Sequence, residues 1–287
     1  MDEKKYKYIL DVKNLERNYY TMTPGGNRIT YSVLKGVSFQ VKPGEFIGIM
    51  GSSGCGKTTL LKTLGMLDKP NGGRVLYKGT PVEEIYGDRL AEIRRKELAF
   101  IFQDYYLMNS LTVKENIMMP LILNEDDPKK SDQAARCEAK RFGIEGLLDK
   151  KPYELSGGEK QRTSICRAMV ANPELILADE PTGNLDSKSS MQVIQTLFYI
   201  NKQFGKTLCL VTHDPKMASY CDRIILLKDG RIINTLIKQD GNEEFYQNII
   251  QQMARLYFPT GVNHLHGLSE PVSRRMKTTL TETVPLN

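Results

Sequence analysis

The stretch GSSGCGKT, residues 51–58, decides the fold. It matches the pattern GxxxxGK[ST], in which backbone N–H groups of a glycine-rich turn and of the helix that follows it point at phosphates. Lys57 would reach the outer phosphates, and Thr58 would give its hydroxyl to Mg²⁺. The short apolar run IGIM (47–50) before the turn predicts a buried strand, and we expect a helix from Lys57 to about Leu67. With both flanks in place, the stretch predicts a phosphate-binding loop, and we expect the side chain of the cysteine within it to be incidental.

Two adjacent carboxylates follow another apolar run, LILADE (175–180). A phosphate-binding loop of this type needs a carboxylate at the end of a neighbouring strand to hold the metal, and Asp179 stands in that place. Glu180 comes next, and strand alternation would separate the two side chains, so that one serves the metal while the other faces an attacking water. An acidic pair at a strand end is more often structural when it stands alone. Beside a phosphate-binding loop, we interpret this pair as functional.

Two more polar residues end apolar strand candidates. His213 follows LCLVT (208–212) at the carboxyl edge of the predicted sheet, where α/β proteins bind ligands, and it is placed to bond a γ-phosphate. Gln103 follows LAFIF (98–102) in the same manner and is placed to touch both metal and water. Taken alone, each of these residues would more often be structural, so their interpretation depends on the loop.

A second glycine-rich stretch, LSGGEKQR at residues 155–162, raises the question of why one chain needs another such turn. Ser156 and Glu159 have the spacing of a capping box, and Gly157 and Gly158 remove side chains from the first helical turn, which would leave an anion site with uncovered donors. An ordinary helix start explains the capping box but not the two glycines. Since the first loop already holds one nucleotide, the simplest explanation is that this turn covers a nucleotide held by another chain. Two copies, head to tail, would close two sites.

Composition excludes several classes of protein. A chain of 287 residues with 40% hydrophobic and 26% charged residues is typical of a soluble globular protein with one large or two small domains. The net charge of +6 indicates solvated faces, or attraction to an acidic surface, rather than nucleic acid.

Five cysteines without a CxxC pair argue against a disulfide framework or a zinc site, so we expect a reducing cytosol. No apolar run approaches the ~18 to 20 residues of a spanning helix, and MDEKKYKY is too charged for a secretory signal. Any role at a membrane is expected to pass through a partner.

The remaining pattern predicts an α/β fold. Strand candidates at 8–12 and 33–41 are separated by the loop TMTPGGNR (21–28), and residues 112–150 predict helices interrupted by NEDDPKK (124–130). After residue 155, helices and strands alternate, which implies a parallel sheet covered by helices on both faces. The elements expected there are helix 157–171, strand 175–179, helix 187–204, strand 207–212, helix 215–220, strand 223–227 and a hairpin around Asp229 and Gly230. Residues 242–258 predict one amphipathic helix, which Pro259 stops.

These motifs together resemble the ATP-binding subunit of an ABC transporter over residues 8–235. The resemblance is carried, in chain order, by GSSGCGKT, Gln103, LSGGE, LILADEPT, GNLD and His213. It implies a P-loop NTPase fold, which is an α/β RecA-like core with an antiparallel β-subdomain and a family-specific α-helical subdomain. It implies an ATPase domain at 8–240, with the helical subdomain at about 104–165. Beyond that domain, the sequence pattern itself predicts a helical extension at 241–260 and, where apolar periodicity is lost, a flexible tail at 261–287.

The resemblance also implies roles for single residues in binding and hydrolysing ATP with Mg²⁺. The implied catalytic residues are Glu180 as general base, His213 as the γ-phosphate contact, and Gln103; the implied metal ligands are Thr58, Gln103 and Asp179. Tyr19 would stack on adenine, with Tyr20 and Tyr31 as alternatives, and Asp186 would make a contact across a dimer. The implied nucleotide-binding residues are Tyr19, Gly51, Ser52, Ser53, Gly54, Cys55, Gly56, Lys57, Thr58, Thr59, Ser156, Gly157, Gly158, Glu159 and Asp186, with the turn at 156–158 acting on the partner's γ-phosphate.

A finer resemblance concerns the kind of transporter. FIFQDYYLMNSLTVKENI and GNLDS resemble the macrolide-exporter, lipoprotein-release and cell-division group, and VTHDPKMASYCDR with FYQNI is more similar to ATPases of bacitracin and lantibiotic resistance transporters of Gram-positive bacteria. This implies a head-to-tail dimer of two copies on an integral membrane permease at the inner face of the cell membrane. It also implies a sensor histidine kinase reached through the permease, and no nucleic acid partner.

Two other functions are left open by the sequence. One is a regulatory ATPase that signals through a permease-like partner without moving a solute, as in antibiotic sensing or cell division. The other is a soluble ATPase of the same family acting on DNA or ribosomes. We favour it least, because such proteins carry two cassettes or a long coiled coil, and the segment between Lys57 and Leu155 leaves little room for one.

Overall fold

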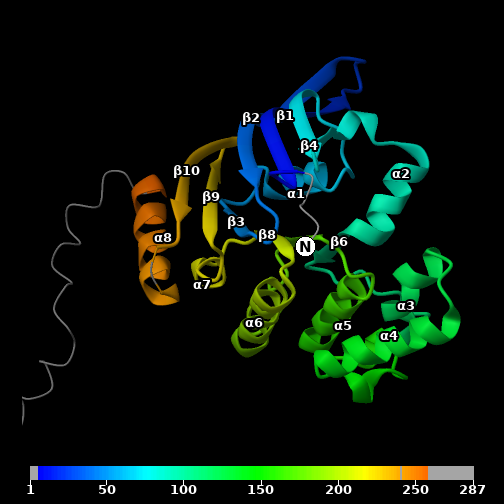
Figure 1. Cartoon of the computed structure of the whole chain (residues 1–287). Helices are drawn as coiled ribbons and strands as arrows, with labels where there is room; N and C mark the ends of the chain where they lie inside the picture. The colour runs from blue at the N-terminus through cyan, green and yellow to red at the C-terminus, as the bar shows by residue number, and fades with distance from the viewer. Residues whose placement is uncertain (1–5, 240, 258–287) are drawn as a thin grey trace, which may run out of the picture. The chain divides into compact units, whose positions relative to one another are not determined.

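The computed structural model describes residues 6–239 and 241–257 of the chain (Figure 1). The chain divides into two units, one ending at Tyr246 and the next beginning at Gln247. The first unit contains two β-sheets and the helices around them. The tail predicted at 261–287 lies outside the described residues.

A six-stranded sheet forms the centre of the first unit, in the order β10-β9-β3-β8-β7-β6. Its strands are β3 (Phe46–Met50), β6 (Leu98–Phe102), β7 (Leu175–Asp179), β8 (Thr207–Val211), β9 (Arg223–Lys228) and β10 (Arg231–Ile237). All neighbours are parallel except β9 and β10, which form the predicted hairpin. Every residue of β3 and β8 is buried, because helices cover parallel strands on both faces. This is why these strands appear in the sequence as apolar runs without alternation.

Helices cover the two faces of the central sheet differently (Figure 1). Helix α1 packs between this sheet and the second one, where it contacts β7, β8 and β2. Helices α5, α6 and α7 lie on the other face (Figure 1). The bounds are α1 (Lys57–Leu64), α5 (Gly157–Met169), α6 (Ser187–Phe204), α7 (Pro215–Ala218) and β2 (Arg28–Val41). The α/β fold predicted from the alternation of elements is confirmed.

The second sheet is antiparallel, in the order β2-β1-β4-β5. Its other strands are β1 (Leu10–Met22), β4 (Gly72–Tyr77) and β5 (Thr80–Pro81). Strands β1 and β2 are longer than predicted, because residues expected in the loop 21–28 pair as far as Met22 with Arg28. No residue of this outer part, 18–22 and 28–32, is buried, so there is no alternation of buried and exposed residues from which periodicity could find it.

Helices α3 (Val113–Leu123) and α4 (Pro128–Arg141) pack against each other and against α5. Thr112 and Glu115 form a capping box at the start of α3, and the Asp127 side chain caps α4. These caps account for the interruption predicted around 124–130. Between β5 and β6, helix α2 (Gly87–Glu92) continues into a π-helical turn, Ile93–Glu97, and a 3₁₀ turn at Val82–Glu84 precedes it.

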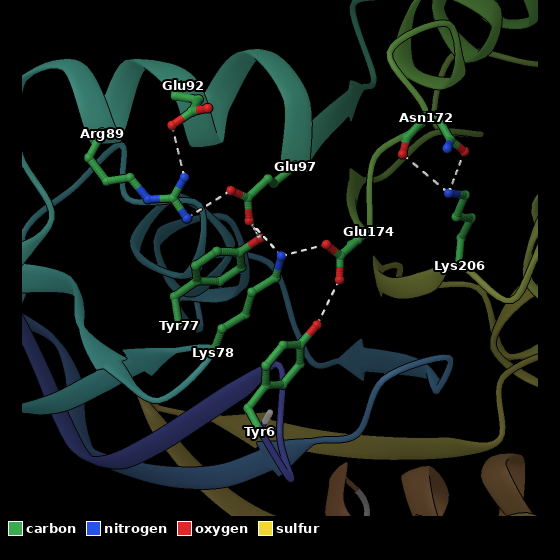
Figure 2. Close-up of polar contacts among 9 residues, drawn as sticks. All are labelled: Tyr6, Tyr77, Lys78, Arg89, Glu92, Glu97, Asn172, Glu174 and Lys206. Atoms are coloured by element: carbon green, nitrogen blue, oxygen red, sulfur yellow. Dashed lines mark hydrogen bonds and ion pairs between the residues drawn. The ribbon is translucent and has the colours of Figure 1, made fainter. Parts of the chain in front are cut away.

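A polar cluster ties the antiparallel sheet to the first residues of two central strands (Figure 2). Lys78 follows β4, and its Nζ donates to Glu97 Oε2 (2.5 Å) and Glu174 Oε1 (2.6 Å), the residues directly before β6 and β7. The hydroxyls of Tyr77 and Tyr6 donate to Glu97 (3.2 Å) and Glu174 (2.7 Å) respectively. Burial and these carboxylates raise the pKa of both tyrosines, so they remain protonated donors. The cluster therefore joins the two sheets at the amino ends of β6 and β7.

The amphipathic helix predicted at 242–258 is present as α8 (Asn242–Tyr257). Among the residues that the structure describes, no helix combines the length and the apolar character needed to cross a membrane.

Candidate nucleotide and metal site

The glycine-rich loop 51–58 connects β3 to α1, as predicted. A Cβ at Gly51 would lie 2.2 Å from the Leu227 carbonyl oxygen, and Gly56 has a φ of 106° at the helix N-cap. Both positions therefore require glycine. The Cys55 side chain packs in the hydrophobic core, which raises the pKa of its thiol, so this residue can face a ligand only through its backbone. Ser52, Ser53, Gly54 and Thr58 are exposed along the loop, whereas Thr59 in the first turn of α1 is half-buried.

The β9–β10 turn packs against this loop, and the sequence pattern did not predict that contact. The Gly230 N–H donates to the Cys55 carbonyl (3.2 Å), and the Lys35 N–H donates to the Gly230 carbonyl (2.9 Å). Gly230 has a φ of 79°, and a Cβ there would lie 2.1 Å from the Val33 carbonyl oxygen. The Asp-Gly pair had indicated a hairpin, but only the fold shows that the hairpin contacts the loop.

The Lys57 side chain folds back and bonds to the start of the same loop. This side chain is only 6% exposed, and Nζ donates to the carbonyls of Gly51 (3.1 Å) and Ser52 (3.0 Å). The Glu180 carboxylate lies 3.8 Å from the same Nζ. A phosphate entering the loop would offer this ammonium charged oxygens in place of neutral carbonyls, which are the weaker partners.

The carboxylate pair lies beside the loop, at the end of β7. The Thr58 hydroxyl donates to Asp179 Oδ1 (3.1 Å), and burial raises the pKa of the Asp179 carboxyl. Glu180 lies beyond the strand with a φ of 45°. The two side chains do separate, Asp179 toward Thr58 and Glu180 toward Lys57. The cause is a left-handed turn at Glu180 rather than the strand alternation that we expected. A non-glycine residue with this φ is uncommon and is often found at functional sites.

His213 completes this group from the end of β8. Its Nδ1 lies 3.2 Å from Glu180 Oε2, and the ring is 66% exposed, against 25% for the Glu180 side chain. The Glu180 carboxylate is thus held between Lys57 and His213, with one partner for each oxygen. The structure brings together five predicted residues from three separate segments of the chain: Lys57, Thr58, Asp179, Glu180 and His213.

Gln103 lies at the same sheet edge, one residue beyond Phe102, which pairs with Asp179. Its Nε2 donates to Asn184 Oδ1 at 3.0 Å. Asn184 was quoted in the motif GNLD but was not predicted as a site residue. Its side chain is the contact between the loop after β6 and the loop after Glu180.

Tyr19 lies on β1 of the antiparallel sheet. Its hydroxyl donates to Asp68 Oδ2 (2.5 Å), and the Arg17 guanidinium lies 4.5 Å from the ring centroid. The residue is 36% exposed, so part of the ring is free for another contact. Of the two alternatives, Tyr31 pairs with Tyr19 across the strands, and Tyr20 carries an arginine over its own ring.

The second glycine-rich turn has the predicted capping box at the start of α5. The Ser156 N–H and hydroxyl each donate to Glu159 Oε2 (2.8 Å), which lowers the pKa of Glu159, and the Glu159 N–H donates to Ser156 Oγ (3.4 Å). A Cβ at Gly157 would lie 3.0 Å from a Leu185 methyl carbon, and one at Gly158 would lie 3.0 Å from a Ser189 hydroxyl. The two glycines therefore also have a packing role within one chain that we did not expect, because Leu185, just before α6, and Ser189 in its first turn lie close against them.

Asp186 caps the neighbouring helix α6. Its carboxylate accepts from the N–H groups of Lys188 (2.9 Å) and Ser189 (3.0 Å) and from the Ser189 hydroxyl (2.6 Å), and these bonds lower its pKa. Since Ser189 also faces Gly158, the N-termini of α5 and α6 lie side by side. Positive ends of two helix dipoles therefore meet on one surface, next to the exposed Ser156.

The donors beside the loop fit a small, oxygen-preferring cation. Thr58 and Asp179 offer a hydroxyl and a carboxylate that already lie within hydrogen-bonding distance of each other. Burial raises the pKa of the Asp179 carboxyl, and a cation bound beside it would favour the charged form. Within the described ranges, no group of three or more His, Cys, Asp and Glu side chains is arranged to hold a metal. A cation here would complete its shell with phosphate oxygens and water, as Mg²⁺ usually does.

Comparison with known proteins gives consistent matches. The family model described as ABC transporter matches residues 34–183. The chain is 42% identical over 248 residues to the ABC transporter ATP-binding protein YxdL of Bacillus subtilis, covering 86% of this chain and 94% of that protein. It is also 42% identical over 244 residues to the bacitracin export ATP-binding protein BceA of Halalkalibacterium halodurans, covering 85% and 94%.

Longer proteins and a solved structure match as well. The macrolide export ATP-binding/permease protein MacB of Pasteurella multocida is 38% identical over 259 residues, which are 90% of this chain but 39% of that protein. A dimeric ATP-binding cassette in a post-hydrolysis state, bound to ADP and phosphate, superposes with a TM-score of 0.73 at 37% identity, covering 80% of this chain and 99% of that one.

Proposed function

This chain belongs to the ABC transporter family of ATP-binding proteins and is an ATPase, and from that premise we propose that it energises a membrane permease in a transporter for peptide-antibiotic resistance. The similarity to BceA, over almost the whole length of that protein, supports the bacitracin or lantibiotic type. The MacB match supports an exporter more generally, and there the permease is part of the same protein.

The observation that carries the proposed mechanism is the position of the Glu180 carboxylate between Lys57 and His213. We assign Glu180 as the general base. It accepts a proton from a water as the water oxygen attacks the γ-phosphorus and the bond to the β–γ bridging oxygen breaks, which leaves ADP and phosphate. Lys57 binds the outer phosphate oxygens, and the exposed edge of His213 faces the γ-phosphate while its Nδ1 holds Glu180.

The proposed metal is Mg²⁺, held by Thr58, Asp179 and Gln103. When bound, it would neutralise charge on the β- and γ-phosphate oxygens. Asp179 and Thr58 already share a hydrogen bond, so both oxygens are oriented toward one place before a ligand arrives. We propose that Tyr19 stacks on the adenine with its free face and that the other loop residues, from Gly51 to Thr59, bind the phosphates.

We propose that two copies close head to tail, so that Ser156, Gly157 and Gly158 of one chain cover the nucleotide on the loop of the other. The meeting of two helix N-termini at this surface supports an anion there. Asp186, which already caps α6, would act across the dimer through this same surface. The helical part at about 104–165 would transmit the opening and closing of the dimer to a permease. Binding to the permease would hold the protein at the inner face of the membrane. It would also bring the protein near a sensor histidine kinase.

The test is reconstitution of the protein in liposomes with the integral membrane permease that co-purifies with it. We expect bacitracin to stimulate ATP hydrolysis and ATP to move or release the peptide, and we expect neither effect from the complex carrying Glu180→Gln. Stimulated hydrolysis without any movement of peptide would support the signalling alternative. Hydrolysis that no permease or peptide alters would contradict the proposed function.

A further inference from the structure

The Asn184 side chain joins two loops of the site. Its Nδ2 donates to the Gln103 carbonyl oxygen (3.3 Å) and to Asp104 Oδ1 (3.2 Å), and its Oδ1 accepts from Gln103 Nε2 (3.0 Å). One carboxamide thus contacts both the backbone and the side chain of Gln103.

Chemistry determines which way round both carboxamides lie. A carbonyl oxygen and a carboxylate only accept hydrogen bonds, so the Asn184 group that faces them must be its NH₂. The oxygen of Asn184 then faces Gln103, and it requires a donor in return. Gln103 therefore turns its NH₂ toward Asn184 and keeps its oxygen, Oε1, for another partner.

The Gln103 carboxamide also packs against the backbone at Gly183, which keeps it next to Asn184. A Cβ at Gly183 would lie 2.8 Å from Gln103 Cδ and 2.9 Å from Nε2, so any side chain at 183 would displace the carboxamide. The short stretch Gly183–Asn184 thus sets both the place and the rotation of the Gln103 side chain.

We propose that Asn184 is a positioning residue that presents the Gln103 oxygen, rather than its NH₂, to the metal. This inference rests on the proposed role of Gln103 as a metal ligand. Mg²⁺ binds oxygen, and an NH₂ group turned toward it would offer only partial positive charge. Without Asn184, the Gln103 carboxamide is free to rotate, and part of the population faces the metal with the wrong group.

The experiment measures Mn²⁺, a spectroscopically visible stand-in for Mg²⁺, by electron paramagnetic resonance with a non-hydrolysable ATP analogue bound to the full chain. We expect Asn184→Ala to raise the Kd of Mn²⁺ about 10-fold, which is the usual loss when a partner of a metal ligand is removed. The affinity for the analogue without metal should not change. Asn124→Ala, which removes an asparagine–aspartate bond (2.8 Å) on another surface, is the matched control.

A second experiment combines Asn184→Ala with Gln103→Glu, and it distinguishes a loss of Gln103 orientation from a general disruption of the metal site. A carboxylate has two equivalent oxygens, so in this background Asn184→Ala should no longer change the Kd of Mn²⁺. An unchanged Kd in Asn184→Ala alone, or an equal rise in both backgrounds, would overturn the inference. If Gln103→Ala also leaves the Kd of Mn²⁺ unchanged, then Gln103 is not a metal ligand. If Gln103→Ala raises this Kd and Asn184→Ala does not, then Gln103 is a ligand but Asn184 does not position it.

Discussion

At the scale of single residues, Glu180 is constrained both in its backbone and in its side chain. Its backbone has a left-handed conformation, and its two carboxylate oxygens face the Lys57 ammonium and the His213 ring. Such a position costs backbone energy, of the order of 1 to 3 kcal/mol, that the surroundings must offset. The carboxylate that we propose as the general base is therefore fixed on both sides before a ligand arrives.

Glu180→Gln is expected to lower kcat about 10²- to 10⁴-fold, because the amide cannot accept a proton, while ATP affinity changes little. Phosphate release and nucleotide binding measure the two quantities separately. Glu84→Gln, an exposed change in the 3₁₀ turn, should leave both at the parental value. Hydrolysis by Glu180→Gln at the parental rate would refute the assignment of the base.

Tyr19→Ala is expected to raise the KM for ATP about 10-fold with kcat nearly unchanged, since stacking of a base on an aromatic ring is worth ~1 to 3 kcal/mol. Tyr20→Ala removes the neighbouring ring of the same strand and should have no such effect. The KM from steady-state hydrolysis distinguishes them. A larger effect at Tyr20 or Tyr31 would move the assignment to that residue.

The sequence located most residues of the site but not the bonds between them. Asp179 and His213 stand at the ends of apolar runs, and Lys57 follows the glycine-rich loop after a third such run. Parallel strands bring their carboxyl ends together, so the meeting of these residues was predictable. The left-handed turn at Glu180 was not, because no local pattern marks it. Neither was the contact of Asn184 with Gln103, which depends on two loops that meet only in the folded chain.

At the scale of elements, the buried parallel strands and α6 were the most predictable. Helix α6 begins and ends where the sequence places it, because Asp186 caps it and Gly205 follows in a left-handed conformation. Strands β1 and β2 were predicted too short, since no residue of their outer part, 18–22 and 28–32, is buried. This pairing depends on the register between β1 and β2, which the hydrophobic periodicity of either strand alone does not predict.

The cluster around Lys78 makes a prediction at this scale. Lys78→Met leaves the Glu97 and Glu174 carboxylates without the ammonium between them, and we expect the free energy of unfolding to fall by about 2 kcal/mol. Lys13→Met, which removes a more exposed ion pair with Asp11, should cost less than about 0.5 kcal/mol. Denaturant titrations of the two variants compare them directly. Equal small losses would mean that the cluster does not join the sheets.

At the scale of the whole molecule, the loop at 51–58 and the turn at 156–158 belong to different parts of one chain. We propose that a second copy of the chain brings the loop of one molecule to the turn of the other. The packing of Leu185 against Gly157 and of Ser189 against Gly158 gives these glycines a role within one chain. The exposed Ser156 and the two helix N-termini therefore support a shared site more strongly than the glycines do.

The most direct test of the shared site mixes two inactive variants. Lys57→Ala removes the ammonium of the loop, and Ser156→Arg fills the covering turn; each protein alone should not hydrolyse ATP, and melting temperatures check that each is folded. In a mixed dimer, the intact loop of one chain meets the intact turn of the other, so the account predicts that hydrolysis returns on mixing and rises with the share of mixed dimers. A mixture in which sedimentation shows mixed dimers but hydrolysis stays absent would contradict it, as would Ser156→Arg alone working at the parental rate.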